Sequence, residues 1–193
     1  KRVIDGLDHP KGEVLIAMVG KYMHLTEAYK SLSEALTHAG VNTHTKVRIK
    51  YVDSEQIEHE GVACLRDADA VLVPGGFGER GVEGKIAAVR YARENQVPYL
   101  GICLGLQCAF IEAARNLAGL EEADSTEFNK NAVHPVICLQ EEQKGIADMG
   151  ATMRLGSCES IVFAGTRAAE LYGNVDRIRE RHRHRYEFNS DYQ

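Results

Sequence analysis

The sequence lacks the features of a membrane-bound or secreted protein. Its longest apolar stretches fall far short of the ~20 residues that a membrane-spanning helix needs. The opening residues, KRVIDGLDHPKGEV, contain no apolar core of a secretory leader. Internal repeats and low-complexity segments are also absent. These absences predict an ordinary globular protein with no membrane partner.

Paired cysteine motifs are missing as well. The chain has five cysteines, an odd number, and none of them forms a CxxC pair. This pattern favours reduced thiols in the cytoplasm over a disulfide framework. Because structural zinc sites usually draw on such pairs, we expect no metal site. The cysteines are Cys64, Cys103, Cys108, Cys138 and Cys158.

An excess of basic residues is a third missing feature. The formal net charge is −5, which argues against a general nucleic-acid-binding protein. Of the 193 residues, 44% are hydrophobic and 26% are charged, which is typical of a soluble domain. A chain of this length is expected to form one domain with a sizeable core.

Short apolar runs alternate with amphipathic stretches through the first two thirds of the chain. This alternation predicts an α/β fold with a central, mostly parallel sheet flanked by helices. Gly40 is predicted to end the first long helix. Strands are expected in EVLIAMVGKY, TKVRIKYV, AVLV, PYLGIC, HPVICLQ and SIVFAG, helices in LTEAYKSLSEALTHAG, SEQIEHEGVACLRDA, VEGKIAAVRYARENQ and LGLQCAFIEAARNLAG, and a loop or hairpin in EEQKGIADMGATMRLG.

One cysteine occurs in a motif that is typical of a nucleophile. Gly101-Ile102-Cys103-Leu104-Gly105 has the form G-x-C-x-G between a predicted strand and a predicted helix. In such an elbow the turning residue has a strained backbone, and glycines two positions away avoid a collision. The sulfur is then exposed at a helix N-terminus, where the helix dipole favours the thiolate. The other four cysteines lack this context and are interpreted as packing residues.

A glycine-rich loop follows a neighbouring predicted strand. PGGFGERG, residues 74–81, lacks the Lys-Ser/Thr of a P-loop and does not match G-x-G-x-x-G. Because ligands bind at the carboxyl ends of parallel strands, the loop and Cys103 are expected to share one crevice. Backbone amides around Gly76 and Phe77, together with that of Leu104, would then form an oxyanion hole. A simple tight turn remains the alternative.

Several segments together resemble a known family. PGGFGERG followed by PYLGICLGLQ resembles the class I glutamine amidotransferases. VGKYMHLTEAYKSLSEAL, ADSTEFN, GATMRLG and ERHRHRYEFN are similar to the glutaminase domains of CTP synthases within that family. The resemblance covers the chain from about residue 13 and implies the class I glutaminase fold, which is flavodoxin-like with a nucleophile elbow. It implies Cys103 as the nucleophile and Gly76, Leu104, Gly105, Leu106, Gln107, Glu127 and Arg185 as glutamine-binding residues.

The resemblance also implies a reaction and its partners. Cys103 would attack the carboxamide of L-glutamine, release ammonia and leave a thioester that water hydrolyses. The ammonia would aminate UTP to CTP in an N-terminal synthetase domain of the same protein. For the full-length enzyme we expect ATP, Mg²⁺, a GTP activator and a homotetramer. No cofactor is expected in the glutaminase domain itself.

The expected catalytic base is not found in the sequence. In the family, a His-Pro-Glu motif supplies the histidine that serves Cys103, and none of the eight histidines here precedes Pro-Glu. His134 is followed by Pro135 and Val136, and a valine cannot orient an imidazole. We therefore expect residues 13–193 to be a C-terminally incomplete domain with negligible turnover, and residues 1–12 to be an interdomain linker remnant.

Two other functions remain open from the sequence. A stand-alone γ-glutamyl hydrolase or cysteine peptidase could use the same fold. A glutaminase-like module could also bind a partner or act as a sensor without catalysis.

Overall fold

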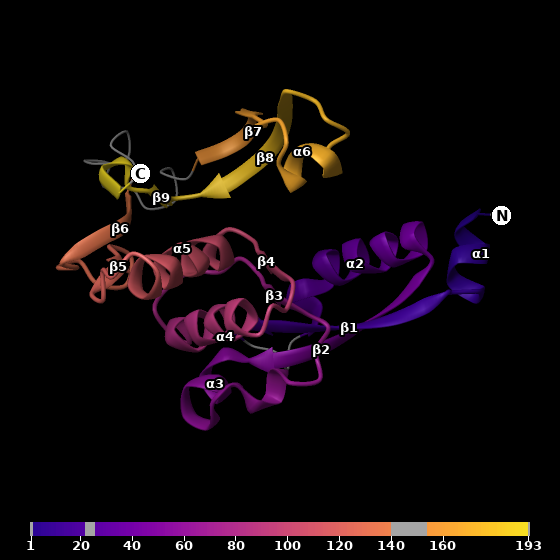
Figure 1. The fold of residues 1–193 in the computed structure, drawn as a ribbon, viewed down its shortest axis with the longest axis horizontal. Coiled ribbons are helices and arrows are strands. Elements are labelled where there is room, and N and C mark those ends of the chain that lie inside the picture. The colour runs from indigo at the N-terminus through magenta and orange to yellow at the C-terminus, as the bar shows by residue number, and fades with distance from the viewer. Residues whose placement is uncertain (1, 22–25, 140–153, 193) are drawn as a thin grey trace. The chain divides into compact units, whose positions relative to one another are not determined.

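The computed structural model describes residues 2–21, 26–139 and 154–192 (Figure 1). The chain divides into two compact units. The first consists of Lys1–Ile137 and Phe188–Gln193, and the second of Cys138–Glu187. Among the described residues, none of the helices combines the length and the apolar character that crossing a bilayer demands.

The first unit contains the predicted parallel sheet. Its four strands lie in the order β2-β1-β3-β4, and every neighbouring pair runs parallel. Ile16 of β1 pairs with Ile49 on one side and with Ala70 on the other, which fixes the register. The α/β fold class is therefore confirmed. The strands are β1 (Gly12–Gly20), β2 (Thr45–Asp53), β3 (Ala70–Val73) and β4 (Tyr99–Gly101).

Helices cover both faces of this sheet (Figure 1). Ala17 and Val19 pack with α3 and α4 on one face, whereas Met18 packs towards α2 on the other. Successive strand residues point to opposite faces, so a sheet covered on both sides needs a continuous apolar run such as VLIAMV. The helices are α1 (Arg2–Asp8), α2 (Lys30–Thr43), α3 (Ser54–Glu60), α4 (Val82–Glu94) and α5 (Leu104–Asn116), with short 3-10 helices at Thr26–Tyr29 and Val62–Leu65.

The end of α2 differs from the sequence prediction. Gly40 does not end the helix, which continues to Thr43 and closes at His44 with a left-handed φ of 52°. Gly40 is buried, and a Cβ there would lie 2.5 Å from the carbonyl oxygen of Thr45. The glycine therefore serves close packing of the helix on the start of β2.

The predicted linker contains a helix in the structure. Residues 2–8 form α1, and a Cβ at Gly6 would lie 2.7 Å from the carbonyl oxygen of Val41. This close approach packs α1 on α2. The division into a linker and a domain stays a prediction.

The remaining elements follow α5 along the chain. A three-stranded sheet has the order β5-β6-β9, with β5 parallel to β6. In the second unit, β7 and β8 form an antiparallel pair. Only Ser160 and Ile161 of the predicted strand SIVFAG lie in β7, which ends at Ile161 and is followed by a turn. The elements are β5 (Ala123–Ser125), β6 (His134–Leu139), β7 (Arg154–Ile161), α6 (Arg167–Leu171), β8 (Arg177–His184), β9 (Tyr186–Phe188) and a 3-10 turn at Ser190–Tyr192.

The predicted loop or hairpin EEQKGIADMGATMRLG falls mostly outside the described residues, and only its last three residues appear, at the start of β7.

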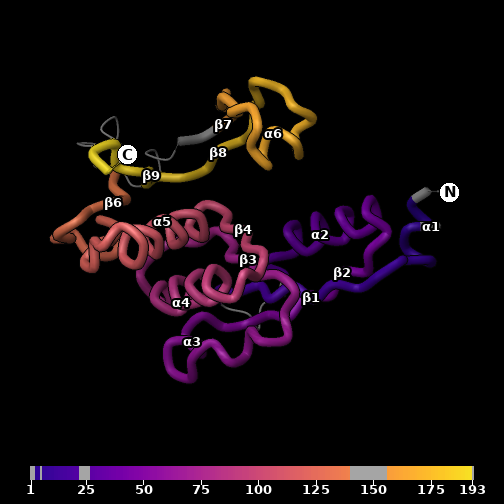
Figure 2. Tube along the Cα trace, viewed as in Figure 1, coloured from indigo at the N-terminus to yellow at the C-terminus, as the bar shows by residue number. Residues whose placement is uncertain are grey.

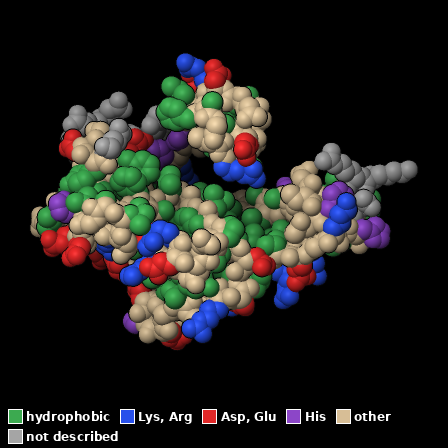
Figure 3. Space-filling model, viewed as in Figure 1, with side chains coloured by type: hydrophobic (Ala, Val, Ile, Leu, Met, Phe, Trp, Pro, Cys, Tyr) green, Lys and Arg blue, Asp and Glu red, His purple; other side chains and the backbone are tan. Residues whose placement is uncertain are grey.

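Charged side chains are distributed over the surface of the first unit. On the face shown in Figure 3, basic and acidic groups are interspersed rather than gathered by sign. Many of them pair, as Lys50 does with Asp67 at 2.7 Å between Nζ and Oδ1. Such exposed pairs contribute about 0–1 kcal/mol each, so the core rather than the surface holds this unit together.

Candidate active site

Cys103 lies at a sharp turn between β4 and α5. Its φ and ψ are 53° and −105°, values that a residue with a side chain rarely adopts. The Ile102 N–H donates to the carbonyl oxygen of Val73 at 3.0 Å, which holds the entry to the turn against β3. The Gln107 N–H donates to the Cys103 carbonyl oxygen at 3.1 Å and begins the helix. The predicted elbow geometry is therefore present, with its strain at the cysteine.

Both flanking glycines are sterically required. A Cβ at Gly101 would lie 2.5 Å from the carbonyl carbon of Gly105 and 2.6 Å from the amide nitrogen of Leu106. A Cβ at Gly105 would overlap the carbonyl oxygen of Val73 on β3. Any side chain at either position would therefore force the turn apart, which is the physical reason for the G-x-C-x-G spacing.

Tyr99 is a support of the elbow that the sequence did not reveal. Its hydroxyl donates to the carbonyl oxygen of Gly105 at 2.7 Å. Burial raises the pKa of Tyr99, so the group stays a neutral donor. The strand itself is less buried than predicted. Leu100 is 55% exposed, and β4 is the last strand in the order of the four-stranded sheet.

The glycine loop lies against the elbow, as the sequence predicted. A Cβ at Gly75 would lie 3.4 Å from the Cβ of Cys103, and one at Gly76 would lie 3.4 Å from the Cδ2 of Leu104. These are van der Waals distances, so the loop backbone borders the cysteine directly. Phe77 is 51% exposed. The backbone of Gly75 and Gly76 thus lies close to the elbow, and the oxyanion role of Gly76, Phe77 and Leu104 stays a prediction.

Glu127 joins the same group of residues from the turn after β5. Its Oε1 accepts a hydrogen bond from the Gly78 N–H at 2.7 Å. Its own N–H donates to the hydroxyl of buried Ser125 at 3.1 Å, which fixes the turn. The structure therefore brings the glycine loop and Glu127 together. The role of Glu127 in holding the substrate's ammonium stays a prediction.

Lys21 is a second residue that the sequence did not single out. It follows β1, and its Nζ donates to the carbonyl oxygens of Phe77 at 2.9 Å and Gly78 at 3.3 Å. The loop is thus tied to charged side chains on both sides. Only its occurrence in the VGKY segment could have drawn attention to it.

The electrostatics of Cys103 differ from the sequence prediction. Burial raises the pKa of its thiol above the ordinary value. A hydrogen bond from the Leu104 N–H lowers the pKa and the negative charge of Glu127 raises it, but burial is the largest effect. The helix N-terminus alone therefore does not produce a thiolate, and reaction at neutral pH needs a base to accept the proton.

The other predicted glutamine-binding residues occupy two places. Leu104, Gly105 and Gln107 are buried in the first turn of α5, while Leu106 is half exposed. Arg185 lies in the second unit, at the bend between β8 and β9. These assignments stay predictions.

Cys108 and His134 make contacts of the kind expected for packing residues. Burial raises the pKa of Cys108 to about 12 on the inner side of α5, and no described cysteine forms a disulfide. His134 lies on β6, with its Nδ1 3.4 Å from the hydroxyl of Tyr192 and the two rings edge to face.

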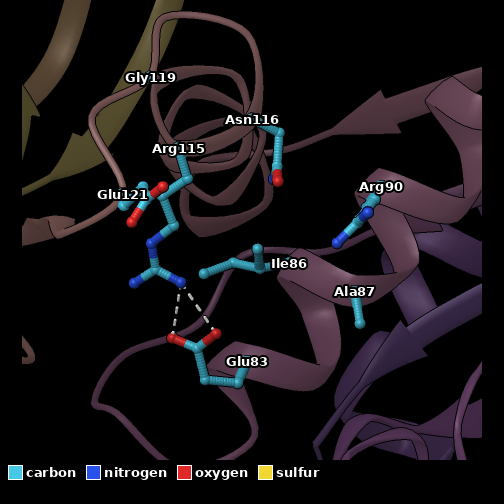
Figure 4. A pocket seen from close by; sticks show the side chains of 8 residues that line it. All are labelled: Glu83, Ile86, Ala87, Arg90, Arg115, Asn116, Gly119 and Glu121. Atoms are coloured by element: carbon cyan, nitrogen blue, oxygen red, sulfur yellow. Dashed lines mark hydrogen bonds and ion pairs between the residues drawn. The ribbon is translucent and has the colours of Figure 1, made fainter.

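A separate pocket of about 630 Å³ lies between α4 and α5, which run side by side in Figures 1 and 2. Arg115 binds Glu83 across it at 2.9 and 3.0 Å, as Figure 4 shows. Arg90, also on its wall, binds Glu94. The basic side chains of this pocket are therefore neutralised by the protein's own carboxylates, and none of the predicted site residues lines it.

Comparisons with known proteins agree with this geometry. The family model for class I glutamine amidotransferases matches residues 24–193. A solved structure described as the glutaminase domain of a Trypanosoma brucei CTP synthase with bound acivicin is 42% identical to the chain. The match covers 93% of this chain and 69% of that one, with a TM-score of 0.85. Similarity along most of the chain thus accompanies the strained cysteine elbow and its neighbouring glycine loop. The chain belongs to the class I glutamine amidotransferase family.

Proposed function

We propose that the chain is a glutaminase domain in which Cys103 attacks L-glutamine and forms a thioester, with turnover that depends on a His-Pro-Glu base not found among its residues. The observation that carries this proposal is the elbow itself, which places a strained, half-buried cysteine beside the backbone of Gly75 and Gly76. The similar trypanosomal glutaminase domain was solved with bound acivicin, a glutamine analogue. A glutamine-like ligand is therefore the expected occupant of the corresponding site here.

The proposed reaction needs the Cys103 thiol, glutamine, water and one base that carries a proton. The Cys103 sulfur bonds to the side-chain carbonyl carbon of glutamine, and the oxygen gains the negative charge. The amides of Leu104, Gly76 and Phe77 are proposed to stabilise that charge. The C–N bond then breaks, ammonia leaves with the proton that the thiol lost, and water hydrolyses the thioester to glutamate. Because burial raises the pKa of the Cys103 thiol, a base must carry that proton.

We further propose that the ammonia aminates UTP to CTP in a synthetase domain of a longer protein. Similarity to a CTP synthase glutaminase domain supports this step. ATP, Mg²⁺ and the activator GTP are proposed for the whole enzyme, and none of them is assigned to residues of this chain. In that enzyme, Cys103→Ala should abolish CTP formation from glutamine and leave formation from added ammonia intact.

A covalent label tests the glutaminase step on this chain directly. Diazo-oxo-norleucine carries a ketone where glutamine has its carboxamide. Its diazo carbon takes up the proton that the thiol loses, and the thiolate then attacks this carbon, which forms a C–S bond and releases N₂. We expect one adduct by intact mass, no adduct in Cys103→Ser, and protection by L-glutamine but not by D-glutamine. Labelling that glutamine does not slow would favour a γ-glutamyl hydrolase or peptidase, and absence of labelling would favour a module without catalysis.

A further inference from the structure

Two charged side chains hold a single peptide group of the glycine loop. Lys21 donates from Nζ to the carbonyl oxygen of Phe77 at 2.9 Å, and Glu127 accepts from the N–H of Gly78 at 2.7 Å. That carbonyl and that N–H belong to the same peptide bond. Hydrogen bonds to ionised groups are about twice as strong as neutral ones. The plane of the Phe77–Gly78 peptide is therefore fixed from both sides by groups outside the loop.

The loop has little conformational preference of its own. Three of the five residues in PGGFG are glycines, and Gly78 adopts a φ of 76° that favours glycine. Since a peptide bond is planar, fixing the group after Phe77 restricts rotation at Phe77 and so the direction of the preceding amide. The backbone just before it borders Cys103 and Leu104. The hydrogen bonds with Lys21 and Glu127 thus restrict the orientation of the loop amides nearest to Cys103.

Lys21 is itself held in place. It follows the last residue of β1, which pairs with Asp53 of β2, and the Tyr29 hydroxyl donates to its carbonyl oxygen at 2.7 Å. Glu127, Glu55 and Glu58 favour its charged form, whereas burial and Arg80 oppose that form and lower the pKa of Lys21 overall. The amine is therefore presented to the loop from the rigid end of the central sheet.

We propose that Lys21 is a positioning residue for glutamine hydrolysis: with Glu127 it orients the Phe77–Gly78 peptide and so keeps the oxyanion-binding amides of the loop beside Cys103. The proposal rests on the proposed function. Lys21 does not touch the reacting atoms, so its effect falls on the rate of attack at a carbonyl and not on the reactivity of the thiol in general.

Two reagents separate these effects in variants of the full chain. The ketone oxygen of diazo-oxo-norleucine takes the place of the glutamine carbonyl oxygen and would accept hydrogen bonds from the proposed oxyanion-binding amides while the sulfur bonds to the neighbouring carbon, whereas iodoacetamide alkylates a thiol without this binding. Lys21→Met removes the donor at nearly the same size, Lys21→Arg keeps a charged donor, and Lys46→Met is a matched control at an exposed lysine on β2. The labelling rate of Cys103 is measured against reagent concentration by peptide mass spectrometry.

We expect Lys21→Met to lower the limiting rate of diazo-oxo-norleucine labelling about tenfold or more, with the half-saturating concentration within about twofold. Iodoacetamide labelling should stay within about twofold, Lys21→Arg should recover most of the rate, and Lys46→Met should match the wild type. A wild-type rate in Lys21→Met overturns the proposal, as does an equal fall with both reagents, which means a general structural role. Failure of the wild type to react with diazo-oxo-norleucine contradicts the proposed function instead, and with it this inference.

Discussion

The two units of the chain are built on different physical principles. In the first, residues of the parallel sheet pack into apolar clusters on both faces, and several of them are fully buried. In the part of the second unit that the structure describes, Ala169 is the one buried side chain, and Phe163 is 75% exposed. The second unit relies on the backbone ladder between β7 and β8, and its ion pair between Arg177 and Glu159 is exposed.

This difference explains where the nucleophile lies. A strained backbone such as that of Cys103 persists only where the surrounding structure over-determines it. The first unit meets that condition, because β3, Tyr99 and two glycines fix the turn from several directions. The antiparallel pair of β7 and β8, with its exposed surface, offers no such constraint.

The largest expected effect comes from breaking the elbow. Gly105→Ala should lower the free energy of unfolding by at least about 3 kcal/mol, because its Cβ would overlap the Val73 carbonyl of a buried strand. Urea unfolding followed by circular dichroism measures this. Gly12→Ala is the matched control, since no atom lies within 4 Å of a Cβ there, and it should change stability by less than about 0.5 kcal/mol. Equal effects at the two glycines would contradict the account of the turn.

A smaller change in the free energy of unfolding, of opposite sign, is expected when a buried lysine of the first unit is replaced. Lys85 on α4 is only 2% exposed, and burial lowers its pKa to about 8 from an ordinary 10.5. Between these two values the unfolded chain binds more protons than the folded one, so wild-type stability rises with pH by up to about 3 kcal/mol. Below pH 8 the full penalty of burying the charge remains.

Lys85→Met removes that penalty. We expect the variant to be more stable than the wild type by about 2 kcal/mol at pH 7, with the difference disappearing towards pH 10.5. The Lys85 Nζ donates to the Gly81 carbonyl oxygen at 3.3 Å in the wild type, and this oxygen keeps a donor in the variant because the backbone N–H of residue 85 also donates to it at 3.3 Å. Urea titrations of both proteins at several pH values measure the difference. A gain that is independent of pH would show that packing and not charge is responsible.

The smallest change in the free energy of unfolding is expected for a substitution in the second unit. Arg177→Ala should change the free energy of unfolding by less than about 0.5 kcal/mol, because both partners of its ion pair with Glu159 are well exposed. The double variant with Glu159→Ala gives the coupling energy in a mutant cycle. A coupling above about 1.5 kcal/mol would mean that the hairpin is held by specific contacts, as the first unit is.

Local patterns explain which parts of the fold were predictable from the sequence. The G-x-C-x-G turn and the apolar strands are read from neighbouring residues, and both appear in the structure. The exposed strand β8 was missed because RIRERHRH shows no apolar face. Gly40 was misread as a helix end because its real constraint, the Thr45 carbonyl, lies in the next strand's backbone.

The supporting residues of the site were hidden for a related reason. Lys21 contacts a loop more than fifty residues further along the chain, and Glu127 reaches the same loop from the other direction. Contacts between residues so far apart in the sequence leave no local pattern from which they could be predicted. The sign of the Cys103 pKa shift was also missed, since burial, which outweighs the helix N-terminus, depends on the packed structure.

Site-mapped competition among the five cysteines tests the central claim most directly. The chain is treated with a limiting amount of diazo-oxo-norleucine, and the adduct on each cysteine is quantified by peptide mass spectrometry. If the elbow and the glycine loop direct Cys103 at the side-chain carbonyl of glutamine, nearly all of the label lies on Cys103. Cys64, half-buried like Cys103, serves as the internal control. Label shared between Cys103 and Cys64 would contradict the account.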